Sequence, residues 1–155
     1  MTVLAFALML ALAAQDDGAA VKTWRGPGRF CGYATSLQVA RGETLEPTAA
    51  AVEAAGYRWS GRFGTIEVAE VNWAARPKFA GTALSSAWRR HLYRQKLDTG
   101  RWQYTLWDGG SLVAKLTGDR FDGSARDLRL VDRVALVDRA GARERGCRFR
   151  LVYAP

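Results

Sequence analysis

The sequence predicts a mainly β fold, namely a single antiparallel β-sandwich or small β-barrel domain with one or two short helices, preceded by a signal peptide. Apolar and polar residues alternate along many short segments. Turn signals such as Asp-Gly-Gly at 108–110 separate these segments, and no regular alternation of strand and helix patterns occurs. Short strands joined by such turns are typical of sandwiches and barrels, and we count seven to nine of them.

The first 14 residues have the pattern of a secretory signal peptide. Residues 2–14 are apolar except for Thr2 and end in small residues, although no Lys or Arg precedes them. A membrane span needs about 20 apolar residues, so this segment is too short for an ordinary one. We expect a signal peptide over 1–14, a flexible lead-in over 15–27 and a single β domain over 28–155. The alternative is a short uncleaved anchor or an ordinary apolar terminus.

The two cysteines lie in the segments that we expect to be the first and last strands of the domain. In a strand over 30–39, Cys31 shares a face with Leu37 and Val39. In a strand over 147–153, Cys147 shares a face with other apolar side chains. Both thiols are therefore expected to point into the apolar interior. In an oxidising compartment they would form a disulfide that joins these strands; the alternative is two buried, reduced thiols.

The segments after the first strand carry mixed signals. The alanine-rich segment 48–55 follows Pro47 and ends at Gly56, which predicts a short helix. The segment 57–73 alternates as a strand does, and the glycines within 61–64 predict a hairpin turn or a bulge there.

The segment 83–97 fits both helical spacing and strand alternation. We favour a strand from about Trp88, because Asp98-Thr99-Gly100 is a good hairpin loop that leads into a strand over 102–107. The turn at 108–110 then predicts a strand over 111–117.

Residues 125–133 are also open to two interpretations. Ser124 followed by Asp127 resembles a capping box, which predicts a short helix from 125 to about 131 and a strand over 134–137. The alternative is one long strand that begins at Leu128.

Charge indicates the class of partner rather than the fold. The chain has a formal net charge of +8, which favours anionic partners. For an exported domain these would be an anionic envelope polymer or lipid head groups, and nucleic acid is disfavoured as a partner. The sequence predicts no stable membrane span after signal cleavage.

The sequence predicts no catalytic, cofactor-binding or metal-binding residue. His91 is the only histidine, and no cluster of His and Cys with zinc spacing occurs. Neither a Gly-x-Ser-x-Gly motif nor a glycine-rich phosphate loop is present. A hydrolase would need two carboxylates across a cleft. The acids available for that role are Glu67, Glu70, Asp108 and Asp132.

The most suggestive surface feature is the hairpin expected around the loop at 98–100. Its register places Arg94 opposite Tyr104 and Lys96 opposite Trp102, close enough for cation–π contacts. Such a face could stack sugar rings beside anionic groups. Alternatively, Trp102 and Tyr104 belong to the core, and the basic stems cover its rim.

These observations lead to an expectation about function. We expect an exported, periplasmic or secreted, non-enzymatic β domain that binds an anionic or carbohydrate envelope component or an envelope protein. The alternative is a small exported hydrolase with an unrecognised carboxylate pair.

Overall fold

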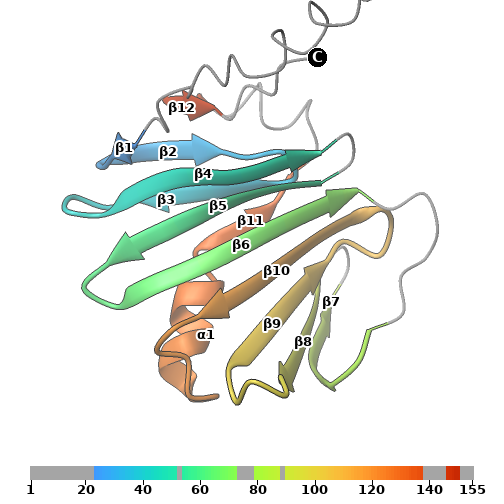
Figure 1. Ribbon diagram of the computed structural model, residues 1–155. Coiled ribbons are helices and arrows are strands. Elements are labelled where there is room, and N and C mark those ends of the chain that lie inside the picture. Colours follow the sequence, from blue (N-terminus) through green and yellow to red (C-terminus); the bar gives the residue numbers. More distant parts are fainter. Residues whose placement is uncertain (1–22, 52–53, 73–78, 88–89, 138–145, 151–155) are drawn as a thin grey trace, which may run out of the picture.

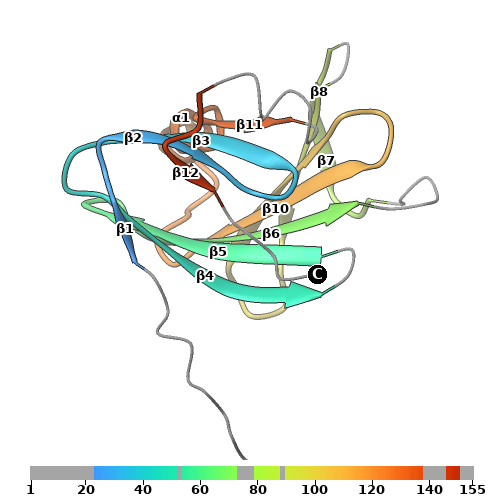
Figure 2. The ribbon, with the colours of Figure 1, turned by 90° about the horizontal axis from the view of Figure 1, so that it is seen from above.

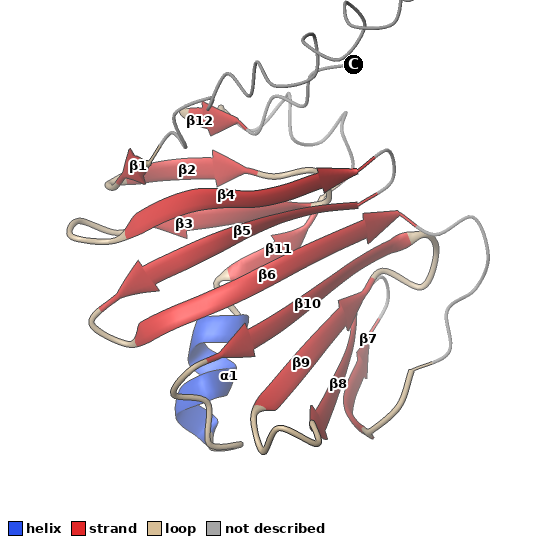
Figure 3. Cartoon of the chain, in the orientation of Figure 1, coloured by secondary structure: helices blue, strands red, loops and turns tan. Residues whose placement is uncertain are grey.

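The structure is a computed structural model that describes residues 23–51, 54–72, 79–87, 90–137 and 146–150. Its strands form a large sheet and a small sheet, and one helix, α1 (Ala125–Val131), accompanies them (Figures 1 and 3). The large sheet contains, in spatial order, β1 (Trp24–Arg25), β4 (Thr44–Ala51), β5 (Ala54–Gly61), β6 (Gly64–Asn72), β10 (Leu112–Gly118), β9 (Trp102–Trp107), β8 (Arg90–Lys96) and β7 (Thr82–Ala87). The small sheet contains β11 (Val134–Leu136), β3 (Thr35–Val39), β2 (Gly28–Cys31) and β12 (Phe149–Arg150).

The two sheets and the helix form a sandwich, which confirms the predicted fold class. Figure 2 shows the small sheet and α1 on one side of the large sheet. The core lies between them, because alternate side chains of the large sheet point inward. On β5, for example, Tyr57 and Trp59 are fully buried while Arg58 between them is exposed.

The segment 30–39 is a hairpin of β2 and β3, so the predicted single strand is wrong. Gly32, Tyr33 and Ala34 make the turn, and the carboxylate of Glu70 on β6 holds it. Glu70 accepts hydrogen bonds from the N–H groups of Tyr33 (2.7 Å) and Ala34 (3.3 Å) and from the hydroxyl of Thr35. The turn therefore depends on a residue far along the chain, which local alternation does not reveal.

The helix predicted over 48–55 is also wrong. Most of this segment belongs to β4 and β5, which pair antiparallel from Thr44↔Ser60 to Ala51↔Ala54. Isolated helices of this length are marginal, and pairing between β4 and β5 gives the backbone of this segment cross-strand partners. Tertiary pairing thus overrides the helix propensity of the alanines.

Several other predictions are confirmed. A turn at 61–64 joins β5 to β6, and the segment 83–97 is strand, divided between β7 and β8. The loop at 98–100 joins β8 to β9, and α1 covers the predicted residues with Ser124 as its N-cap. The predicted total of seven to nine strands is too low, because the segment 30–39 divides into β2 and β3 and because β1, β4 and β7 were not predicted.

The first and last described strands, β1 and β12, each lie at the edge of one sheet. The short β1 lies within the range expected as a lead-in, and it pairs with β4 at the edge of the large sheet. The last strand is described only as β12, which pairs in parallel with β2 through Phe149↔Phe30. This confirms that the first and last strands lie close together.

The predicted signal peptide, the connection 138–145 and residues 151–155 lie outside the described residues. No helix of the described chain is long and apolar enough to cross a membrane.

Cys31 and Cys147 form the expected disulfide, with their Cα atoms 5.7 Å apart. Its position differs from the prediction. Phe30 belongs to the main core, so its neighbour Cys31 points to the opposite side of the small sheet. There the disulfide packs with Val137 in a separate, smaller cluster.

Candidate functional site

The predicted binding surface in the β8–β9 hairpin has the expected register but does not form one exposed face. Arg94 pairs with Tyr104 and Lys96 with Trp102. Tyr104, however, is 0% exposed and donates a 3.1 Å hydrogen bond to Oδ2 of Asp127 on α1. Since burial also raises the pKa of Tyr104 to about 12, its phenol is a neutral part of the core. A ligand cannot contact this side chain.

Arg94 also makes its contacts within the protein. Its guanidinium carbon lies 5.1 Å from the centroid of the Trp102 ring, and its Nη1 donates a 2.6 Å hydrogen bond to the carbonyl of Gly123. A Cβ at Gly123 would lie 2.9 Å from the same ring. Arg94 and Trp102 therefore pack the loop before α1 against the sheet, and only Lys96 is exposed.

Each of the four carboxylates considered for a hydrolase forms hydrogen bonds or ion pairs within the protein. Glu70 is fully buried, and burial raises its pKa against the opposing effect of hydrogen bonds from Thr35 and the Tyr33 and Ala34 N–H groups. Asp108 accepts hydrogen bonds from the N–H groups of its own turn. Glu67 and Asp132 form surface ion pairs with arginines. In the described chain, the one raised carboxyl pKa thus belongs to a group without access to a substrate.

Among the described residues, His91 has a serine neighbour but no carboxylate partner of the kind that a catalytic triad needs. Its Nδ1 lies 2.9 Å from Oγ of Ser86, and its ring lies 4.9 Å from that of Trp107. A triad needs a carboxylate that orients the histidine. None of the hydrogen bonds among described side chains joins His91 to a carboxylate.

The outer face of the large sheet carries a feature that the sequence analysis missed. Opposite the side covered by the small sheet, six polar side chains line up on adjacent strands, and each is exposed or half-buried. We call them the polar row; in order across β4, β5, β6, β10, β9 and β8 they are Glu46, Arg58, Glu67, Thr117, Gln103 and Gln95. At about 4.8 Å between strands, this row is about 24 Å long.

Contacts within the polar row keep its side chains in place. Gln95 Nε2 donates to Oε1 of Gln103 at 3.3 Å, and Gln103 Nε2 donates to Oγ1 of Thr117 at 3.1 Å. At the other end, Arg58 lies 3.9 Å from Glu46 and 3.8 Å from Glu67. These exposed ion pairs contribute little to stability, so their groups are available to a ligand.

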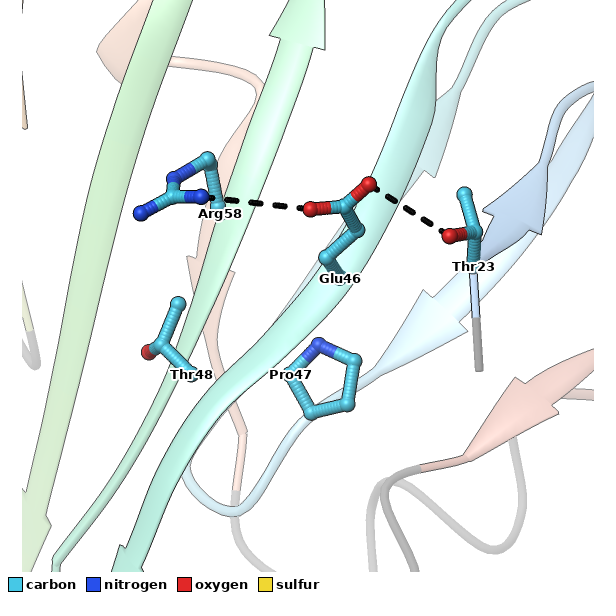
Figure 4. Close-up of a pocket in the computed structure, with 5 residues that line it drawn as sticks. All are labelled: Thr23, Glu46, Pro47, Thr48 and Arg58. Atoms are coloured by element: carbon cyan, nitrogen blue, oxygen red, sulfur yellow. Dashed lines mark hydrogen bonds and ion pairs between the residues drawn. The ribbon is translucent and has the colours of Figure 1, made fainter. Parts of the chain in front are cut away.

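A shallow pocket of about 350 Å³ lies at the β4 end of the polar row (Figure 4). It is lined by Thr23, Glu46, Pro47, Thr48 and Arg58. Thr23 Oγ1 donates a 3.4 Å hydrogen bond to Oε1 of Glu46, on the side away from Arg58. The pocket thus combines hydroxyl, carboxylate and guanidinium groups.

Aromatic rings lie near the other end of the polar row. Tyr93 shares the outer face of β8 with Gln95, two residues away. The Phe79 ring lies 4.8 Å from that of Tyr93 and 5.4 Å from that of Trp107. Tyr93 and Phe79 are half-buried, while Trp107 is buried, so the first two rings present the accessible aromatic surface.

The central strands of the outer face are balanced in charge, and Arg25 on β1 adds one positive charge at its edge. Its described ionisable residues on β4, β5, β6 and β10 are Glu46, Glu67, Arg58 and Lys115. Two positive and two negative groups cancel, in contrast to the strongly basic chain as a whole. A face with many donors and acceptors, little net charge and nearby rings suits an uncharged polyhydroxylated ligand. No known protein family, characterised protein or solved structure matches this chain.

Proposed function

We propose that this chain is an exported, non-catalytic binding domain whose large sheet binds an extended, uncharged carbohydrate of the cell envelope. The observation that carries the proposal is the polar row, which crosses six strands and ends in the pocket around Glu46 and Arg58. Sugar hydroxyls both donate and accept hydrogen bonds. The amide, hydroxyl, carboxylate and guanidinium groups of the row supply both kinds of partner.

The length of the polar row favours a chain of sugars over a single sugar. A monosaccharide would fill only part of a row of about 24 Å. The rings of Tyr93 and Phe79 supply apolar faces on which the C–H side of a sugar can pack. Because the face is open, it also accommodates the interior of a long polymer.

Two further features support the remaining parts of the proposal. The Cys31–Cys147 disulfide is typical of oxidising compartments, which supports export together with the apolar segment at 2–14. The states of Glu70 and Asp108 favour binding over hydrolysis, because Glu70 is fully buried and Asp108 accepts hydrogen bonds from its own turn, whereas a general acid must reach its substrate.

Affinity gel electrophoresis in soluble neutral polysaccharides (dextran, glucomannan and xylan) tests the proposal, with the anionic polymer alginate as comparison. We expect at least one neutral polymer to retard the protein. The double variant Arg58→Ala/Gln103→Ala should weaken this binding about tenfold, since each lost hydrogen-bonding group contributes about 0.5–1.5 kcal/mol.

A matched control removes the same two residue types elsewhere. Gln38 and Arg62 are exposed and lie outside the outer face of the large sheet, so Gln38→Ala/Arg62→Ala should bind as the wild type does. Retardation by alginate alone, or equal retardation of both double variants, would contradict the proposal.

A further inference from the structure

A second surface has the opposite electrostatic character. Five arginines from separate segments meet beside β2, and we call this surface the basic edge. Its members are Arg25, Arg29, Arg41, Arg133 and Arg148. Arg25, Arg41 and Arg148 are exposed, and Arg29 and Arg133 are half-buried.

Hydrogen bonds to backbone carbonyl groups show that these segments are neighbours. The N–H of Arg148 donates a 2.9 Å hydrogen bond to the carbonyl of Arg29, and its Nη1 donates another of 2.9 Å to the carbonyl of Pro27. Arg133 Nη2 donates to the carbonyl of Gln38 at 2.8 Å, and Gln38 is the cross-strand partner of Arg29.

The remaining two arginines adjoin the same place. Gly26 packs so closely on the β3–β4 turn that a Cβ there would lie 2.0 Å from the carbonyl oxygen of Ala40. Since Arg25 precedes Gly26 and Arg41 follows Ala40, both arginines lie at this contact. The five arginines of the basic edge therefore come from four parts of the chain that lie next to one another.

Little negative charge offsets the basic edge. Within the described residues 23–43, 133–137 and 146–150, Glu43 is the single carboxylate. It is buried and already accepts two hydrogen bonds from Arg133. Arg25, Arg29 and Arg41 therefore have no other acid within these described segments, and the acids just outside them are Glu46, which accepts a hydrogen bond from Thr23, and Asp132, which precedes Arg133.

We propose that the basic edge docks on the phosphate head groups of an anionic lipid surface. Arginine binds phosphate with two parallel hydrogen bonds. The five arginines are spread over four neighbouring parts of the chain, which fits an array of phosphates better than one small anion. Arg29 lies on the outer side of the small sheet, because its neighbour Phe30 belongs to the core. The proposal does not depend on carbohydrate binding.

Co-sedimentation of the full chain with phosphatidylcholine vesicles, with and without phosphatidylglycerol, tests this proposal. We expect binding only when phosphatidylglycerol is present, and weaker binding as salt increases. The triple variant Arg25→Gln/Arg29→Gln/Arg41→Gln should bind about 100-fold more weakly, since each basic residue near such a surface contributes roughly fivefold. Arg41→Gln alone, in an exposed turn, should weaken vesicle binding about fivefold. This single variant shows the effect of one lost charge even if the triple variant does not fold.

A control with equal loss of charge separates a local surface from net charge. Arg62→Gln/Lys96→Gln/Arg101→Gln removes three charges from the β5–β6 turn and from the end of the β8–β9 hairpin, and should change binding less than threefold. An equal loss in both triple variants, or none in either, would overturn the proposal. Binding to the soluble polyanion dextran sulfate but not to the vesicles would overturn the lipid as the occupant. Arg58→Ala/Gln103→Ala should leave vesicle binding intact, so failure of the two proposals can be distinguished.

Discussion

Arg133 donates two hydrogen bonds to Glu43, from Nη1 to Oε1 at 2.8 Å and from Nη2 to Oε2 at 2.7 Å, across 90 residues of chain. Its guanidinium carbon also lies 4.6 Å from the centroid of the Trp59 ring. Trp59 Nε1 donates to the same carboxylate at 3.0 Å, as does the N–H of Ala40 at 2.9 Å. This arrangement fixes the β3–β4 turn to β5 and to the segment that follows α1.

Arg133→Ala should lower the free energy of unfolding by about 2–4 kcal/mol. The substitution leaves the mostly buried Glu43 carboxylate without its cation, and unpaired buried charges are strongly destabilising. Urea denaturation followed by tryptophan fluorescence measures the change. The matched control is Arg90→Ala, which breaks the exposed 2.7 Å pair with Asp132 and should cost less than about 1 kcal/mol. Equal costs for the two variants would contradict this assignment.

Turns were the elements that the sequence predicted best. Asp98-Thr99-Gly100 and Asp108-Gly109-Gly110 form where expected, because positive-φ glycines at 100 and 109 and the Asp108 carboxylate act within a few residues. The same local logic located α1 behind Ser124. These features depend on neighbours in sequence, so alternation and turn chemistry suffice.

The hairpin of β2 and β3 could not be predicted because its turn is stabilised from another strand. Its residues Gly32, Tyr33 and Ala34 continue the strand-like alternation, and the turn is stabilised by Glu70, 36 residues after Ala34. Gly32 has no room for a side chain, since a Cβ would lie 2.3 Å from Oε1 of Glu70. Only the fold brings these groups together.

Glu70→Gln should alter the pH dependence of stability in a defined direction. Burial raises the pKa of Glu70 in the folded state, so its contribution to stability is present below the unfolded-state pKa and is lost as pH rises through the folded-state pKa. The stability of the wild type relative to Glu70→Gln should therefore decrease from acidic to neutral pH. Urea unfolding at a series of pH values measures this difference.

Glu43→Gln is the matched comparison because its shift has the opposite sign. Burial alone would raise the pKa of Glu43, but hydrogen bonds from Arg133, Ala40 and Trp59 lower it overall. Its contribution is present above the unfolded-state pKa and is lost as pH falls through the folded-state pKa. The wild type should thus gain stability over Glu43→Gln as pH rises. If both differences changed in the same direction, one of the two environments would be wrongly assigned.

The polar row was hidden in the sequence for a different reason. Gln95, Gln103 and Thr117 occupy ordinary outward positions of three strands, and nothing in each strand alone marks them. They become a row only when the register of β8, β9 and β10 is known, and a shift by one residue would reverse their faces. The β8–β9 register was predicted correctly, but the residues proposed as a binding surface, such as Arg94 and Tyr104, lie on the inward face of that hairpin.

The Cys31–Cys147 disulfide joins β2 to a residue two positions before β12, and among the described residues these strands pair in parallel through Phe149↔Phe30 and Arg150↔Cys31. Among the described residues, Val137 packs with this disulfide in a separate cluster. The covalent bond therefore adds to the backbone pairing that keeps β12 in place.

Cys31→Ala/Cys147→Ala should therefore lower the free energy of unfolding by about 4–5 kcal/mol, the chain-entropy value for a closed loop of about 100 residues. The loss should begin locally: the amide of Arg148, which donates to the Arg29 carbonyl, should exchange with solvent faster than the amides that pair β9 with β10. Urea denaturation gives the free energy, and hydrogen exchange followed by NMR locates the change. Wild-type protein reduced with a phosphine should behave as the double variant does, because reduction removes the same crosslink without changing a side chain in the main core. Unchanged protection of Arg148 in both samples would mean that backbone pairing, and not the disulfide, holds β12 against β2.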